Sequence, residues 1–199
     1  MYVAFEGGEG SGKSTQARLL AERWGAILTF EPGATPLGAD LRRLLLDPEG
    51  SPMGPRAEAL LMAADRAQHL DAVVRPALAA GRAVVSDRSA YSSLAYQGGA
   101  RGLGIDAVRS LNDWVLEGSW PDLVLLLDLP PEVAAARLGA GRDRMEREAD
   151  TFHRMVTDAF RKLAEAEPDR FVVLDATRPV EDLSSQVWME VTRRMGRCR

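Results

Sequence analysis

The sequence predicts a three-layer α/β fold in which a five-stranded, mainly parallel sheet lies between two layers of helices. Two observations predict it. Five apolar runs of strand length alternate with segments of helical periodicity, which is typical of parallel α/β sheets. The run Leu123–Asp128 is apolar up to its final carboxylate, as a strand buried on both faces should be. No linker or repeat divides the 199 residues, so we expect a single domain over 1–199.

The first half of the chain is expected to begin with a strand at Tyr2–Glu6, followed by a glycine-rich loop and a helix over 14–24. Then follow, in order, a strand at 26–30, a turn at 31–33, a helix at 40–46, a loop at 47–55 and a helix at 56–80. We expect Pro76 to kink or interrupt that helix. Its inward face is expected to carry Leu60, Ala63, Ala67, Leu70 and Val74.

The second half opens with a strand at 83–87 that ends in Asp87, and a helix is expected to begin over 89–97. Glycines at 98, 99, 102 and 104 predict a loop. The later elements are a helix at 105–117, a strand at 123–128, helices at 130–138 and 149–166, a strand at 171–175 and a helix at 180–195. Sites in such sheets lie beyond the carboxyl ends of the strands, so we expect the functional site there.

Composition argues against several classes of protein. A formal net charge of −4 gives no broad basic surface, which argues against nucleic acid as a main partner. Cys198 is the only cysteine, so neither an intramolecular disulfide nor a cysteine-based metal cluster can form. The chain shows no secretory signal and no apolar stretch of membrane-spanning length. We therefore expect a cytoplasmic protein that associates with neither nucleic acid nor membrane.

The glycine-rich loop has the spacing G-x-x-x-x-G-K-[ST] immediately after a strand and before a helix. Consecutive backbone N–H groups can wrap a phosphate only if the turn adopts dihedrals that glycine tolerates, and the helix N-terminus adds further donors. We expect Lys13 to reach the terminal phosphates of ATP and Ser14 to join the shell of Mg²⁺. The whole predicted nucleotide-binding loop is Gly7, Gly8, Glu9, Gly10, Ser11, Gly12, Lys13, Ser14 and Thr15.

The alternative for this loop is a plain turn between strand and helix, which the joint presence of motif, strand and helix disfavours. Lysine usage points the same way, because only Lys13 and Lys162 are lysines among 25 basic residues. A compact point charge suits this position better than the planar fork of arginine.

Three classes of protein carry such a loop: GTPases, motor or transporter ATPases, and small-molecule kinases. Asn112 is the only asparagine and is followed by Asp113, so the Asn-Lys-x-Asp guanine motif is absent. One domain leaves little room for an ATPase's coupling machinery. A kinase acceptor site has candidates in Met62 with Arg66, in Asp87-Arg88 and in Ser92 to Gln97. For Asp65 and His69, each taken alone, we expect solvated surface side chains.

The motifs resemble those of bacterial thymidylate kinases, in family order over nearly the whole chain. They are Phe5 to Thr15, Glu31-Pro32-Gly33, Ala63 to Arg66, Asp87-Arg88, Ser92 to Gly98 and Asp143-Arg144-x-Glu146. The Ala-Tyr-Gln-Gly block with Asp-Arg upstream is the most specific. The resemblance implies a P-loop kinase fold with a short arginine-rich lid, and transfer of the ATP γ-phosphoryl group to thymidine 5′-monophosphate (dTMP) with Mg²⁺. It also implies a homodimer.

The resemblance implies a role for each matching residue of the acceptor site. Arg66 would address the thymine carbonyl, Ser93 with Gln97 the ring edge, and Tyr96 the ribose 2′ position. Arg42 and Arg88 would hold the acceptor phosphate, Glu9 would face the 3′-hydroxyl, and Asp87 would order Mg²⁺ or its water shell. Three departures concern specificity. Met62 stands where a Phe usually stacks on thymine, Phe30 where an Arg is usual, and Ser89 where a Tyr is common.

A cation over the transferring group is expected from a lid at about 139–148, because residues between Gly7 and Gly12 include no basic side chain. The candidates are Arg142, Arg144 and Arg147, with Gly139 and Gly141 as permissive hinges. We expect this segment to be mobile without nucleotide and to close over ATP. Two alternatives stay open: a non-catalytic nucleotide-binding regulator, and a kinase for a different small acceptor.

Overall fold

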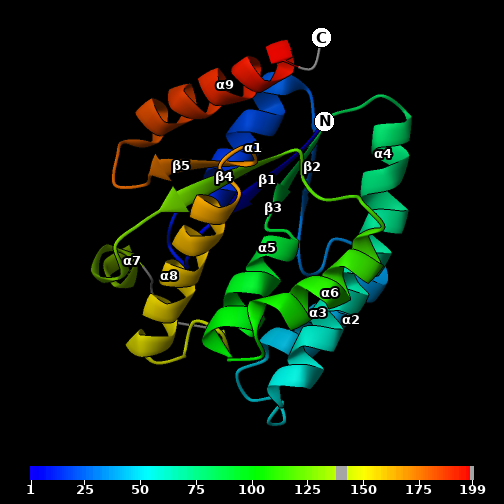
Figure 1. The fold of residues 1–199 in the computed structure, drawn as a ribbon, viewed down its shortest axis with the longest axis vertical. Coiled ribbons are helices and arrows are strands. Elements are labelled where there is room, and N and C mark those ends of the chain that lie inside the picture. The colour runs from blue at the N-terminus through cyan, green and yellow to red at the C-terminus, as the bar shows by residue number, and fades with distance from the viewer. Residues whose placement is uncertain (138–142, 198–199) are drawn as a thin grey trace.

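The computed structural model describes residues 1–137 and 143–197, and these have the three-layer arrangement that the sequence predicts (Figure 1). Within the described residues a five-stranded sheet runs in the order β2-β3-β1-β4-β5, and every neighbouring pair is parallel. Its strands are β1 (Tyr2–Glu6), β2 (Ile27–Phe30), β3 (Val84–Asp87), β4 (Leu123–Asp128) and β5 (Phe171–Asp175).

The central strands are apolar throughout because both of their faces are covered. In β4, Leu125 packs into the cluster formed with helices α1 (Lys13–Trp24) and α9 (Val180–Arg197). The next residue, Leu126, points to the opposite face and packs with helix α8 (Asp150–Ala166). Alternation of side chains along a strand therefore serves two cores at once.

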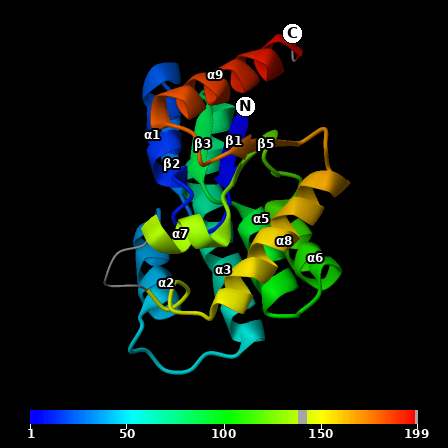
Figure 2. The same cartoon turned by 90° about the vertical axis from the view of Figure 1, so that its left-hand side faces the viewer.

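Two layers of helices enclose this sheet, as Figure 2 shows: α1 lies beside α9, across the strands from the helices of the other layer. That other layer contains α3 (Pro55–His69), α5 (Ala90–Ser93), α6 (Ile105–Leu116) and α8. The short helix α2 (Pro36–Leu46) packs on α3, and α7 (Pro131–Arg137) contacts the glycine-rich loop at Gly10. None of the described helices is long and apolar enough to cross a membrane.

Strand order gathers three loops at one edge of the sheet. In the register of the sheet Asp87 faces Phe5 of β1 on one side and Phe30 of β2 on the other. The glycine-rich loop follows β1, the Glu31-Pro32-Gly33 turn follows β2, and Arg88 follows β3. Segments far apart in the sequence therefore meet where the chain leaves the sheet.

The long helix expected over 56–80 is interrupted as predicted, but one of its residues is placed differently from the prediction. It divides into α3, a π-helical turn η1 (Leu70–Val74) and α4 (Arg75–Ala79). The widened turn lies just before Pro76, which has no N–H to donate and crowds the preceding turn, so the expected interruption is confirmed. The inward placement of Leu60 is wrong, since its side chain is 58% exposed.

Two further boundaries differ from the sequence prediction. Helix α2 begins at Pro36 rather than at residue 40, because the Thr35 side chain caps it by accepting the Gly38 N–H at 2.9 Å. Gly98 and Gly99, expected in a loop, continue α5 as a second π-helical segment, η2 (Leu94–Ala100).

Candidate active site

A cleft of about 650 Å³ opens where the segments that follow β1, β2 and β3 meet. All residues predicted to contact the acceptor line it: Glu9, Arg42, Met62, Arg66, Arg88, Ser93, Tyr96 and Gln97. Lys13, Ser14 and Asp87, predicted for phosphate and metal, line it as well. A single cavity therefore holds both predicted halves of the site. Gly10, Gly12 and Thr15 of the loop also line it, whereas Gly7, Gly8 and Ser11 do not.

The phosphate loop adopts the backbone that the motif predicts. Gly10 and Gly12 have φ of 71° and 89°, in the left-handed region that favours glycine. At Gly7 a Cβ atom would lie 2.6 Å from the Leu127 carbonyl oxygen, so only glycine fits.

The ammonium group of Lys13 lies against this loop. It donates to the Gly8 carbonyl at 2.7 Å and to Ser11 Oγ at 3.3 Å. Burial, together with the nearby charge of Arg88, lowers the pKa of Lys13. An anion placed in the loop would be the natural partner for this buried cation.

Ser14 and Asp87 offer a pair of hard oxygen ligands at the mouth of the loop. Ser14 Oγ donates to Asp87 Oδ2 at 2.5 Å. The other carboxylate oxygen, Oδ1, is buried and has no hydrogen-bond partner in the described part of the chain. A buried, unpaired carboxylate oxygen beside a hydroxyl suits Mg²⁺, which prefers oxygen ligands and completes its shell with water and phosphate. These two residues fit the metal.

Arg88 projects from β3 with a strained backbone, since its φ of 77° is left-handed in a residue that is not glycine. Its guanidinium pairs with the Glu9 carboxylate and lies 5.2 Å from the centre of the Tyr96 ring. The Ser92 hydroxyl accepts a further N–H at 3.2 Å. Such strain is typical of functional positions, and here it aims a cation into the cleft.

Glu9 places a negative charge in a loop that is predicted to bind phosphate, and a neighbouring cation balances that charge. Its head group bonds to Arg88 and accepts the Tyr96 hydroxyl at 2.9 Å. Burial alone would raise its pKa, but the charges of Arg88 and Lys13 prevail and lower the pKa of Glu9 to about 2. Glu9 is therefore ionised at neutral pH and faces the acceptor part of the cleft.

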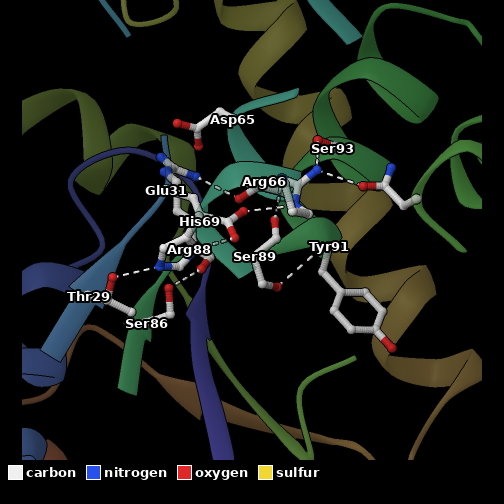
Figure 3. Close-up of polar contacts among 12 residues, drawn as sticks. Thr29, Glu31, Asp65, Arg66, His69, Ser86, Arg88, Ser89, Tyr91 and Ser93 are labelled. Carbon is white, nitrogen blue, oxygen red and sulfur yellow. Dashed lines mark hydrogen bonds and ion pairs between the residues drawn. The ribbon is translucent and has the colours of Figure 1, made fainter. Parts of the chain in front are cut away.

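A buried polar network lies under the acceptor part of the cleft and is drawn in Figure 3. Glu31 accepts from Arg66 Nε at 2.8 Å and contacts His69 Nδ1 at 2.8 Å. The other ring nitrogen of His69 bonds to Thr29 Oγ1 at 2.6 Å. Burial would raise the pKa of Glu31, yet the Arg66 charge and the His69 hydrogen bond lower it.

This network corrects two sequence expectations. His69 is fully buried and Asp65 is 1% exposed, so neither is a solvated surface residue. Asp65 Oδ1 accepts the Gly33 N–H at 3.0 Å and thereby holds the turn after β2. The same turn orients Arg42, because Arg42 Nη1 donates to the Pro32 carbonyl of the turn at 2.7 Å.

Glu6 is a further residue that the sequence interpretation did not single out. Its buried carboxylate accepts the Ser89 N–H at 2.8 Å and the hydroxyls of Ser89 and Ser92 at 2.7 and 2.6 Å. Ser89 also caps α5. Glu6 therefore ties the start of α5 to the end of β1, beside Arg88. A carboxylate at the end of an apolar strand was the available signal.

The predicted lid arginines are placed differently from one another. Arg142 lies outside the described residues, as do Gly139 and Gly141. Arg144 does not line the cleft and donates to the buried Glu58 at 2.8 Å, while Arg147 forms an exposed ion pair with Glu49. Arg137, which the sequence interpretation did not consider, lines the cleft and donates to the Gly10 carbonyl at 3.4 Å.

The family model described as Thymidylate kinase matches residues 5–187. Curated relatives with the name Thymidylate kinase are similar along nearly the full length. The chain is 50% identical to one from Leifsonia xyli subsp. xyli, over 94% of this chain and 92% of the relative. It is 48% identical to one from Synechococcus sp. (98% and 96%) and 46% identical to one from Halothermothrix orenii (96% of each).

Proposed function

The chain belongs to the thymidylate kinase family, and we propose that it transfers the γ-phosphoryl group of ATP to dTMP, giving thymidine 5′-diphosphate for dTTP synthesis. One observation carries the proposal: a single cleft is lined by phosphate-loop residues such as Lys13 and by polar side chains such as Arg66 and Gln97. Catalysis of phosphoryl transfer is largely positioning and charge stabilisation, so both substrates must share one cavity.

At the donor part of the cleft, the loop amides and Lys13 would hold the ATP phosphates. Ser14 and Asp87 would hold Mg²⁺, directly or through its water shell, and the metal would neutralise charge on the phosphates. The Ser14–Asp87 hydrogen bond and the unpaired Oδ1 of Asp87 support this assignment. A further cation from the segment at 139–148, or Arg137 beside Gly10, would cover the γ-phosphoryl group.

At the acceptor part, Arg42 and Arg88 would bind the phosphate of dTMP, and Glu9 would face the 3′-hydroxyl. Tyr96 would occupy the space beside the ribose 2′ position, since its ring packs against Phe152 and Phe160 and cannot easily move. Arg66, Ser93 and Gln97 would contact the base, with Met62 against its face. The buried network below Arg66 supports a preformed base pocket.

The protein would act as a cytoplasmic homodimer. Three large apolar side chains are exposed on adjacent helices: Leu44 on α2 (60%), Leu60 on α3 (58%) and Trp114 on α6 (79%). A second copy packed on these three helices would remove the side chains from water. Equilibrium sedimentation tests this: the parent should be dimeric, and Leu60→Glu should be monomeric.

The function is tested by measuring ADP release from ATP and Mg²⁺ against a panel of nucleoside monophosphates. dTMP should be the preferred acceptor. Tight ATP binding without turnover on any monophosphate would instead identify a nucleotide-binding regulator. A preference for another acceptor would identify a kinase of different specificity.

A further inference from the structure

Glu58, in the first turn of α3, is a buried carboxylate behind the acceptor part of the cleft. It is 1% exposed and does not line the cleft itself. Arg101 grips it with a fork, Nε to Oε1 and Nη2 to Oε2, both at 3.1 Å. Arg144 Nη2 adds a contact to Oε2 at 2.8 Å. Charge on both sides and the bidentate fork fix the orientation of this carboxylate.

Gln97 completes the set of donors around Glu58. Its amide nitrogen Nε2 donates to Glu58 Oε1 at 2.8 Å. An ionised carboxylate can only accept hydrogen bonds, so Gln97 must present its NH₂ group, never its carbonyl, to Glu58. The side-chain oxygen Oε1 of Gln97 is thereby left for the cleft that this residue lines, and no described group donates to that oxygen.

Arg66 contributes the opposite polarity to the same pocket. Four of its five N–H groups are accepted within the described residues, by Glu31, Ser93, Asn112 and the Ser89 carbonyl. A guanidinium has no acceptor, so whatever it offers to the cleft is a donor. The pocket thus combines a fixed donor from Arg66 with a fixed acceptor from Gln97.

This pattern is complementary to a pyrimidine that carries a ring carbonyl next to a ring N–H, as thymine and uracil do. Cytosine has an amino group and an unprotonated ring nitrogen at the same two places, so both contacts would be mismatched. A buried mismatch of hydrogen-bonding groups is a strong basis for rejecting an analogue.

We propose that Glu58 is a positioning residue for base selection: by holding the Gln97 amide in one orientation, it makes the pocket accept thymine and reject cytosine. The inference rests on the proposed function, because it assumes that Gln97 and Arg66 face the base of the acceptor. Glu58 itself would touch no substrate. Its effect would be transmitted entirely through Gln97, so a change at Glu58 should have no effect on base selection once Gln97 is replaced.

The test is the ratio of kcat/KM for dTMP to kcat/KM for deoxycytidine monophosphate in the parent, Glu58→Gln, Gln97→Leu and the double variant. In Glu58→Gln the Gln97 amide can rotate, so the ratio should fall at least tenfold while the KM for ATP stays within twofold. In the Gln97→Leu background the same change at Glu58 should leave the ratio unaltered. A ratio unchanged in Glu58→Gln, or lowered equally in both backgrounds, would overturn the inference.

Glu58→Asp guards against a folding defect, because it keeps the charge that Arg101 and Arg144 need. One methylene shorter, it cannot hold the arginine fork and also reach Gln97, so the ratio should fall severalfold. A parental ratio in this variant would overturn the inference even if Glu58→Gln did not fold. Failure of the parent to phosphorylate dTMP would overturn the proposed function instead, which keeps the two claims separable.

Discussion

Ser14 and Asp87 are 73 residues apart in the sequence, yet the Ser14 hydroxyl donates to the Asp87 carboxylate at 2.5 Å. The pairing of β1 with β3 brings them together, since Asp87 lies opposite Phe5, just before the phosphate loop. The hydrogen bond links the start of α1 to the end of β3. The second carboxylate oxygen of Asp87 is buried and has no partner in the described chain.

Asp87→Asn should raise the Mg²⁺ concentration needed for half-maximal activity and lower kcat, because an amide is a weaker ligand for a hard divalent cation. The measurement is a magnesium titration of turnover at saturating ATP and dTMP. Binding of ATP in the presence of EDTA is the control and should match the parent. A magnesium titration identical to that of the parent would remove Asp87 from the metal site.

Lys13→Ala should lower kcat by at least a hundredfold with the fold retained, since it removes the buried cation of the loop. Lys13→Arg should fail almost as badly. The Gly8 carbonyl and Ser11 Oγ accept from one compact ammonium at 2.7 and 3.3 Å, a geometry that the planar fork of arginine does not reproduce. Steady-state turnover and thermal melting of both variants test this; near-normal turnover of the arginine variant would refute it.

Glu9 should make stability depend on pH in the acid range. Its folded pKa of about 2 lies below the ordinary 4.5, so ionised Glu9 stabilises the fold above about pH 4.5. That contribution, on the order of 3 kcal/mol, should be lost as the pH falls from 4.5 towards 2. Glu9→Gln has no group to titrate at this position. The difference between its unfolding free energy and that of the parent should therefore change across this window, and a constant difference would contradict the assignment.

Arg66→Ala should lower stability as well as dTMP affinity. Arg66 is 2% exposed and is the cationic partner of the buried Glu31, which would be left with His69 alone. Leaving a buried charge without its partner costs about 3–5 kcal/mol. Urea unfolding of Arg66→Ala and of Arg42→Ala, where no buried ion pair is broken, measures the contrast. Equal stability of the two variants would show that the network is not important for folding.

The three lid arginines should give different results on substitution. Arg147→Ala, which removes an exposed ion pair with Glu49, should change stability by less than about 1 kcal/mol. Arg144→Ala should lower stability by disturbing Glu58.

If a residue of the expected lid supplies the catalytic cation, Arg142→Ala should lower kcat at least tenfold, about 1.4 kcal/mol, with dTMP affinity retained. A parental kcat in a variant with Arg142, Arg144 and Arg147 all changed to Ala would show that the catalytic cation comes from elsewhere, and Arg137→Ala would then be the variant to measure.

Local patterns were sufficient to predict the strands and the phosphate loop. The apolar run 123–128 and the glycine spacing at 7–12 each carry their structure within a few residues. The family resemblance named the acceptor residues, and all of them line one cleft. His69 shows what local patterns miss. Its burial depends on Thr29 and Glu31, from a different segment, and nothing in the helix around His69 indicates those partners.

Distant partners also explain why the burial of Leu60 and Glu58, two residues apart on α3, differs from what the sequence pattern predicts. The helical period of apolar residues placed Leu60 inward, but it is 58% exposed. Glu58, a charged residue, is 1% exposed because Arg101 and Arg144 come to it from later in the chain. Hydrophobic periodicity takes no account of distant partners that neutralise a charge. It therefore predicts that Leu60 is more buried than Glu58, whereas the reverse is true.

The proposed function requires that one cleft bring the γ-phosphoryl group of ATP to the phosphate of dTMP. This claim is tested by incubating the protein with Mg²⁺, dTMP and ATP labelled with ³²P at the γ position. The label should appear in thymidine diphosphate, in equal amount to the ADP formed, and Lys13→Ala should abolish that transfer. ADP formed with the label in inorganic phosphate, or no label in any thymidine nucleotide, would contradict the claim.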